Sequence, residues 1–383
     1  MAVLLKAGTD KTVNRVRYKN GAAGLAEVVR IYLKNGLGQL RELFRQLFVP
    51  GIDLVLDTRG DMHEILVCSN TYLFSYFNNY YASNPPICCF DANLTSIGGL
   101  SLNAASSPYF AAAASVGTYS LFAGGYVANS TAIVPTGAVY AFSDSLVRTN
   151  PTALSTARGA PAGAAVGNYA LFAGGDSSTT GTMAASAVVN AYSASMVRST
   201  PTALSVARIA LGGISNGTYA LFVGGSNSSG ANVTTVEAYN ASLTRTTLSS
   251  MTSNGSGNYM CANAAIADYF LIYNGNSGFE VYSKALVKQS FITVSPNYGI
   301  SGCHTFDRSC AVFLGYDSYS SKKAIGFAYD NTLVRSSVLT PALPVVGCGA
   351  IGFKDHVVFA KGSYAVGNTF ATIPHAQTLR YYK

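Results

Sequence analysis

Short apolar segments recur along most of the chain with a period of about 50 residues. Three nearly identical copies read GTYSLFAGG, GNYALFAGG and GTYALFVGG. Apolar runs of this length between glycines are typical of strands that are buried on both faces. The tyrosines of these copies are Tyr119, Tyr169 and Tyr219, and four weaker copies, which bring the number to seven, lie at Tyr72, Tyr269, Ser309 and His356.

A second pattern follows each apolar segment and contains an aromatic residue. In three units it reads VYAFSDSLVR, VNAYSASMVR and VEAYNASLTR, around Phe142, Tyr192 and Tyr239. A linking segment, RTNPTALSTAR or RSTPTALSVAR, then leads into the next unit. The pattern within each unit predicts four short strands, for example at 160–166, 169–173, 188–192 and after Arg198. The small residues of the first strand suit a crowded central axis. Degenerate copies of the aromatic pattern lie at Phe90, Tyr282, Tyr329 and Tyr382.

The paired glycines, the later aromatic residue and the period together resemble kelch repeats. The resemblance covers about residues 52–383 and implies an all-β fold, a seven-bladed kelch-type β-propeller. It departs from the usual pattern because the chain has no Trp, and tyrosines stand at the blade position that Trp usually holds. The lack of Trp also argues against a Trp-Asp-repeat propeller. The last unit ends after its third strand, so we expect strand 52–57 to close the ring over 51–383.

Residues 1–50 predict a small β/α anchoring segment. Lys-Asn-Gly occurs twice, 15 residues apart, and Asn-Gly is a strong turn signal. We expect strands at 13–18 and 28–33, followed by an apolar helix that ends before Pro50. This segment is too small to bury its apolar residues alone, so we expect it to dock on the propeller, on other copies or on a larger assembly. The expected assembly interface consists of Leu37, Leu40, Leu43, Phe44, Leu47 and Phe48.

Charge is concentrated in this same segment. The chain has 383 residues, only 11% of them charged, and a net charge of +8. Residues 1–50 contain nine Lys or Arg and three Asp or Glu, a net +6. The basic residues alternate with apolar ones and form no run, which favours a partner-facing segment over nucleic-acid binding.

Seven cysteines occur without a CxxC pair. Their odd number and irregular spacing indicate free thiols in a protein that is assembled in a reducing cytoplasm. No run of 18 apolar residues is present and no signal peptide is recognisable, so we expect no insertion into a membrane.

Catalytic motifs are weak. Gly213-Ile-Ser215-Asn-Gly217 matches a nucleophile elbow, but Ala165 occupies the place of Ser215 in the preceding unit, which indicates a turn. His63 and Glu64 begin like a zinc-protease helix, but Val67 replaces its second histidine. Kelch-type copper-radical oxidases use two Tyr and two His, but the resemblance does not extend to their ligand motifs around His304 or His356. We therefore expect no catalytic residue, metal, cofactor or enzyme activity.

The loops between second and third strands are rich in Ser, Thr, Asn, Gly and Tyr. Aromatic faces with amide and hydroxyl groups suit neutral carbohydrate, because sugar rings stack and their hydroxyls hydrogen-bond. Solvated connections without a ligand are the alternative. The candidate binding residues are Asn78, Tyr80, Tyr81, Tyr126, Asn129, Asp176, Asn227, Asn276, Tyr316, Asp317 and Tyr319.

The first 50 residues resemble the short tandem repeats that begin tail-associated proteins of phages of Gram-positive bacteria. The matching positions are 18–26 and 32–40, and the usual Ala-Arg ending is replaced. This resemblance implies a non-enzymatic virion protein on the tail or particle surface, which binds other virion proteins through residues 1–50, forms homo-oligomers and presents loops to a host-surface glycan. The alternatives are a purely structural capsid or tail decoration, and a free bacterial carbohydrate-binding or copper-radical oxidase propeller.

Overall fold

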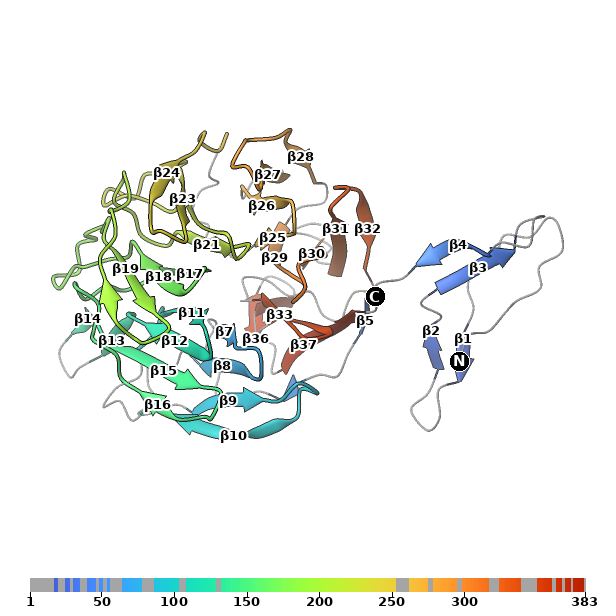
Figure 1. The fold of residues 1–383 in the computed structure, drawn as a ribbon, viewed down its shortest axis with the longest axis horizontal. Helices are drawn as coiled ribbons and strands as arrows, with labels where there is room; N and C mark the ends of the chain where they lie inside the picture. Colours follow the sequence, from blue (N-terminus) through green and yellow to red (C-terminus); the bar gives the residue numbers. More distant parts are fainter. Residues whose placement is uncertain are drawn as a thin grey trace.

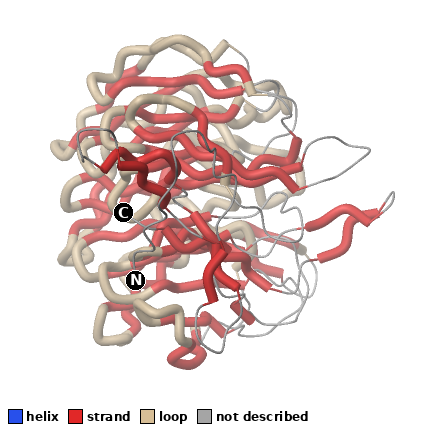
Figure 2. The backbone as a smooth tube through the Cα atoms, turned by 90° about the vertical axis from the view of Figure 1, so that its right-hand side faces the viewer, coloured by secondary structure: helices blue, strands red, loops and turns tan. Residues whose placement is uncertain are grey.

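A computed structural model gives the fold. It describes residues 17–19, 25–27, 30–34, 40–45, 48–50, 54–55, 64–77, 86–102, 108–128, 132–252, 262–274, 278–294, 298–316, 324–338, 350–359, 363–366, 369–372 and 375–381. Within these ranges the protein is all-β, and the loops connect strands without an intervening helix (Figure 2). The described residues accordingly contain no helix that could cross a membrane.

In the described part of the chain, seven antiparallel sheets of four or five strands surround a common centre (Figure 1). The first sheet contains β7 (Glu64–Cys68), β8 (Leu73–Phe77), β9 (Pro86–Phe90) and β10 (Ser96–Ser101). The second contains β11 (Ala112–Val116), β12 (Tyr119–Ala123), β15 (Val139–Ser143) and β16 (Arg148–Thr149). The third contains β17 (Ala162–Val166), β18 (Tyr169–Ala173), β19 (Val189–Ser193) and β20 (Arg198–Ser199).

The remaining large sheets repeat this order. The fourth contains β21 (Gly212–Ser215), β22 (Tyr219–Val223), β23 (Val236–Asn240) and β24 (Arg245–Thr247). The fifth contains β25 (Asn263–Ala265), β26 (Tyr269–Tyr273), β27 (Gly278–Ser283) and β28 (Ile292–Thr293). The sixth contains β29 (Tyr298–His304), β30 (Cys310–Tyr316), β31 (Ala324–Asp330) and β32 (Arg335–Ser337). The strands predicted at 160–166, 169–173 and 188–192 correspond to β17, β18 and β19.

The last sheet combines the two ends of the chain. It contains β33 (Ala350–Phe353), β34 (His356–Phe359) and β37 (His375–Tyr381), and β37 pairs with β5 (Phe48–Pro50). The strand expected at 52–57 is observed as β6 (Leu54–Val55), which pairs with the beginning of β37. The first 55 residues therefore supply two strand segments to this sheet, one more than we expected.

Four small hairpins complete the described strands. They are β1 (Arg17–Lys19) with β2 (Leu25–Glu27), β3 (Arg30–Lys34) with β4 (Leu40–Arg45), β13 (Tyr126–Ala128) with β14 (Ile133–Pro135), and β35 (Ser363–Val366) with β36 (Thr369–Thr372). Of the strands expected near the N-terminus, the one at 28–33 is observed as β3. The one at 13–18 lies mostly outside the described residues and overlaps β1.

The helix expected over 37–48 is wrong. Leu40, Leu43 and Phe44 lie in β4, and Phe48 lies in β5, whereas Leu37 and Leu47 lie outside the described residues. β4 pairs with β3 from Lys34↔Leu40 to Arg30↔Arg45. The intervening segment begins with Asn-Gly, which is a hairpin signal, and a short apolar run cannot by its spacing alone distinguish strand from helix.

The first strands of the seven sheets lie side by side around the centre. β7, β11, β17, β21, β25, β29 and β33 each contact the next, and β33 also contacts β7. Small residues permit this approach: a Cβ atom on Gly163 would lie 2.2 Å from the Ala113 carbonyl oxygen, and one on Gly213 would lie 2.2 Å from the Gly163 carbonyl oxygen. The small residues of the first strand therefore do face a crowded axis.

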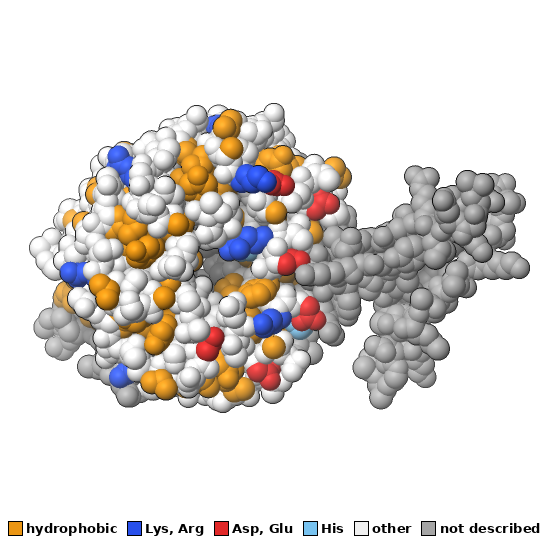
Figure 3. Space-filling model, viewed as in Figure 1, with side chains coloured by type: hydrophobic (Ala, Val, Ile, Leu, Met, Phe, Trp, Pro, Cys, Tyr) orange, Lys and Arg blue, Asp and Glu red, His pale blue; other side chains and the backbone are white. Residues whose placement is uncertain are grey.

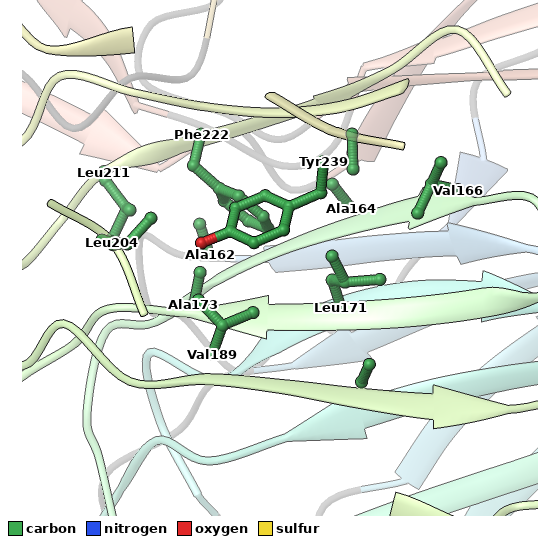
Figure 4. Packing of buried hydrophobic residues seen from close by; sticks show 12 residues of the cluster. Ala162, Ala164, Val166, Leu171, Ala173, Val189, Leu204, Leu211, Phe222 and Tyr239 are labelled. Carbon is green, nitrogen blue, oxygen red and sulfur yellow. The ribbon is translucent and has the colours of Figure 1, made fainter. Parts of the chain in front are cut away.

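The hydrophobic core is divided among the interfaces between neighbouring sheets. Between the third and fourth sheets, Leu171 and Val189 pack with Phe222 and Tyr239 (Figure 4). Each of these side chains is fully buried, which contributes about 1.5–3 kcal/mol for an aliphatic or Phe side chain. Each sheet buries both of its faces in this way, as the uninterrupted apolar runs predict.

Candidate binding surfaces

The loops between second and third strands form one candidate surface. In the second sheet this connection is the β13–β14 hairpin, which begins at Tyr126. The Tyr126 ring lies 5.4 Å from the ring of Tyr109, between centroids. It also covers Gly159 so closely that a Cβ atom there would lie 2.1 Å from the ring. Tyr126 is therefore fixed by packing at this end of the sheets.

Hydrogen bonds connect this hairpin to the loops of the next two sheets. The Tyr126 hydroxyl donates to Oδ2 of Asp176 over 2.8 Å. Oδ1 of Asp176 accepts from the backbone N–H groups of Ser178 and Ala184 at 3.0 and 2.8 Å. The N–H of Ala185 donates to the Ser228 hydroxyl over 2.9 Å. The loops of three successive sheets thus form one continuous, hydrogen-bonded surface.

Four of the predicted binding residues lie in the described part of the chain. Tyr126 and Asp176 lie together, and Asp176 is buried. Asn227 lies in its own loop, where its Oδ1 accepts from the N–H groups of Ser229 and Ala231, both at 3.0 Å. Tyr316 ends strand β30. The residues Asn78, Tyr80, Tyr81, Asn129, Asn276, Asp317 and Tyr319 lie outside the described part of the chain.

A second candidate site lies on the axis, at the opposite end of the sheets. It is a cavity of about 450 Å³ that is lined by first strands and by their turns into the second strands. Ala113, Ser115, Ala165 and Ser215 are among the small lining residues. Figure 3 shows a hollow at the centre of this view, with a Lys or Arg side chain beside it.

Larger polar side chains that line this cavity include Asn70, Cys68, His304 and Arg308. The Cys68 thiol donates to the Gly352 carbonyl over 3.6 Å, and burial raises its pKa to about 12. Burial, together with the charge of Arg308, lowers the pKa of His304 to about 3. Burial also lowers the pKa of Arg308. At neutral pH the thiol and the imidazole are uncharged and the guanidinium is positive.

Sequence reasoning missed this cavity because its polar residues come from different, degenerate units. A sequence signal was present in the turns that follow the first strands, where two units have a basic residue at the place of glycine. Gly117 and Gly167 take positive φ values of 57° and 52° after their first strands, and Arg308 and Lys354 take φ values of 55° and 54° in the corresponding turns. Basic residues therefore replace glycine at the cavity mouth in the last two units.

The catalytic motifs have other roles in the structure. Ser215 ends β21, and its hydroxyl accepts from the Gly217 N–H over 3.0 Å, in a turn between two strands. This is the turn predicted from the repeat. His356 is buried in β34, and its Nδ1 lies 2.8 Å from Asp355 Oδ1. His63 lies outside the described residues. Within the described ranges no three His, Cys, Asp or Glu side chains gather as a metal site.

The described cysteines form no disulfide. Each of Cys68, Cys88, Cys89, Cys303 and Cys310 is outside any disulfide, as the irregular spacing predicts for this part of the chain. Cys261 and Cys348 lie outside the described residues.

Comparison with known proteins supports the fold alone. Neither protein families nor curated proteins give a match to this sequence. Among solved structures, the chain is similar to YjhT, a kelch-like propeller, with a TM-score of 0.51 and 9% identity. The alignment covers 85% of this chain and 99% of YjhT. The protein thus has an all-β fold that is similar to kelch-like propellers.

Proposed function

We propose that the chain forms a closed, seven-bladed β-propeller of the kelch type. Seven large sheets, the continuous contacts among their first strands and the return of β33 to β7 support this architecture. The pairing of β37 with β5 and β6 supports closure by strands from the beginning of the chain. A ring closed in this way leaves no free edge between its first and last blades.

We further propose that this propeller is a non-enzymatic component of a phage or phage-tail-like particle, and that its loop surface binds a host-surface glycan. The observation that carries the binding proposal is the series of hydrogen bonds from Tyr126 through Asp176 to Ser228. Loops held in one arrangement before binding lose little conformational entropy when a ligand arrives. The resemblance of residues 1–50 to the beginning of phage tail proteins supports the particle location.

The chemistry of the loop surface is suited to a neutral, hydroxyl-rich ligand. Ser178, Thr180, Asn227 and Ser228 contribute hydroxyl and amide groups to it. Two apolar side chains, Ile133 and Met183, are 46% and 43% exposed. Carbohydrates combine apolar ring faces with hydroxyl groups, so both kinds of contact are required to bind them. Residues 1–50 would then bind other virion proteins and bring several propellers together.

Two measurements test this function. Immunogold labelling with antibody to residues 52–383 should label the tail tip of purified particles, and the full chain should bind a subset of a bacterial-glycan array. Met183→Ser should reduce array binding at least tenfold, whereas Val334→Ser, at the other end of the sheets, should leave it unchanged. Gold along the tail or over the capsid without array binding would indicate a structural decoration protein. Unlabelled particles would overturn the virion assignment.

A further inference from the structure

Arg308 is a partly buried residue whose guanidinium group has no hydrogen-bond partner among the described residues. Its Nε atom is buried and makes no hydrogen bond, and none of the described acidic residues forms an ion pair with it. The neighbouring Asp307 is engaged within the turn, where its Oδ1 accepts from the Thr305 hydroxyl and from the Ser309 N–H. A buried charge that lacks a counter-ion is costly, which points to a partner outside the chain.

The guanidinium is held across the cavity mouth. Arg308 belongs to the β29–β30 turn, in which its N–H donates to the Thr305 carbonyl over 2.8 Å and its own carbonyl accepts from Ala267 over 3.0 Å. A Cβ atom on Gly217 would lie 3.5 Å from a terminal nitrogen of Arg308. The side chain therefore reaches from the sixth sheet to the fourth. Its position is set by backbone hydrogen bonds to two sheets.

His304 supplies a second donor to the same cavity. Its Nδ1 accepts from the Ala265 N–H at 3.4 Å, so the proton of the neutral imidazole lies on Nε2. No described residue accepts a hydrogen bond from Nε2. Among the residues that the structure describes, the cavity thus combines a cation and a neutral donor that have no side-chain partner, and the lining contributes no carboxylate.

Lys354 adds positive charge at the rim. Its ammonium nitrogen lies 5.4 Å from the centre of the Phe306 ring, which also lines the cavity. Oxyanions are bound by this combination of a guanidinium, which can donate two parallel hydrogen bonds, and nearby neutral donors. The volume of about 450 Å³ is within the range of small-molecule sites.

We infer that the axial cavity is a binding site for a small organic molecule with a carboxylate or phosphate group, and that Arg308 and His304 bind this oxyanion. The site is distinct from the proposed glycan surface, because the two lie at opposite ends of the second strands. Small residues such as Ser115, Ala165 and Ser215 leave room for the uncharged remainder of the molecule. Either proposal can therefore fail without the other.

The test titrates the full chain with inorganic phosphate and, separately, with acetate at constant ionic strength set by potassium chloride. Thermal unfolding followed by circular dichroism should show a saturable rise in midpoint, because a ligand that binds only the folded state stabilises it. Saturation by phosphate alone identifies a phosphate ligand, and saturation by acetate alone identifies a carboxylate ligand. A linear or absent response to both would overturn the inference.

Three variants locate the binding site. Arg308→Gln should raise the half-saturating concentration at least tenfold. Ala165→Leu, which fills the cavity and leaves Arg308 in place, should have the same effect even if the first variant folds poorly. Lys284→Gln removes an equal charge from the surface ion pair with Asp268 and should titrate like the wild-type protein. Wild-type saturation in the first two variants would refute the assignment.

Discussion

Replacement of Arg208 by Met should destabilise the protein far more than the same replacement at Arg158. Both arginines end a linking segment, and both are fully buried. Arg208 forms an ion pair with Glu237 and donates to the carbonyls of Thr235 and Phe222 at 2.6 and 3.2 Å. Without Arg208, the buried carboxylate of Glu237 would still accept a hydrogen bond from the Ser205 N–H. Its remaining cation would be Arg245, whose Nη1 lies 3.9 Å from Oε1 of Glu237.

The two arginines should differ in their contribution to the free energy of unfolding because the partner of Arg208 is charged and that of Arg158 is neutral. Breaking a buried ion pair from one side costs about 3–5 kcal/mol, because it leaves an uncompensated charge. Arg158 instead donates to the neutral Asn190 amide oxygen over 2.7 Å and to the Gly174 carbonyl over 2.9 Å. Each hydrogen bond to a charged donor contributes about 1.5–3 kcal/mol, but removal of Arg158 also removes a buried charge that has no acidic partner among the described residues, which offsets much of this loss. Asn190 also retains its hydrogen bonds with Ser155.

Urea denaturation of the full chain measures both costs, with circular dichroism or tyrosine fluorescence as the signal, since the chain has no Trp. The double variant Arg208→Met with Glu237→Leu should recover most of the loss, because apolar replacement of a whole buried ion pair is often neutral. An Arg208→Met variant within about 1 kcal/mol of wild type, or a double variant no more stable than the single one, would refute the reasoning.

Three further predictions concern the linkers, the pairing of β37 with β5 and β6, and the cavity. Tyr239→Phe removes the hydroxyl that donates to the Thr202 carbonyl over 2.8 Å and should cost about 1 kcal/mol in urea denaturation; an unchanged midpoint would contradict this. Deletion of residues 1–56 removes β5 and β6 and exposes the edge of β37, so size-exclusion chromatography should show association, whereas deletion of 1–46 should not. The pKa of His304 in the folded protein is lowered to about 3. Between about pH 3 and 6.5 the unfolded chain therefore binds more protons at this residue than the folded protein does. The free energy of unfolding should accordingly fall as the pH is lowered through this range. His304→Gln should reduce that slope by up to about 1.4 kcal/mol per pH unit; an identical slope would contradict the assignment.

The repeat pattern predicted the strands because it reflects packing. Apolar runs, glycine pairs and aromatic residues recur where each sheet contacts its neighbours, so their period identifies the repeating unit. The same register places Tyr126 and Asp176 together, since they lie 50 residues apart at equivalent positions of successive units. β4 was not predicted, because a six-residue run has too few positions to separate a period of two from one of 3.6.

The polar interior was not predicted, because charge in a linking segment ordinarily indicates exposure. Arg158 and Arg208 are buried because each linker brings its arginine against the next sheet, whose backbone carbonyls accept hydrogen bonds from the guanidinium. Pairing of Arg208 with Glu237 needs contact between residues 29 positions apart. Arg308 was missed for a related reason, because the sixth unit has a longer turn whose direction no periodicity reveals.

The buried tyrosines explain how a kelch-like arrangement persists without Trp. The hydroxyls of Tyr192, Tyr239 and Tyr282 donate to carbonyls of the linkers that enter their own sheets, over 2.7, 2.8 and 2.7 Å. Each ring fills the interface, while its hydroxyl satisfies a carbonyl that has no strand partner.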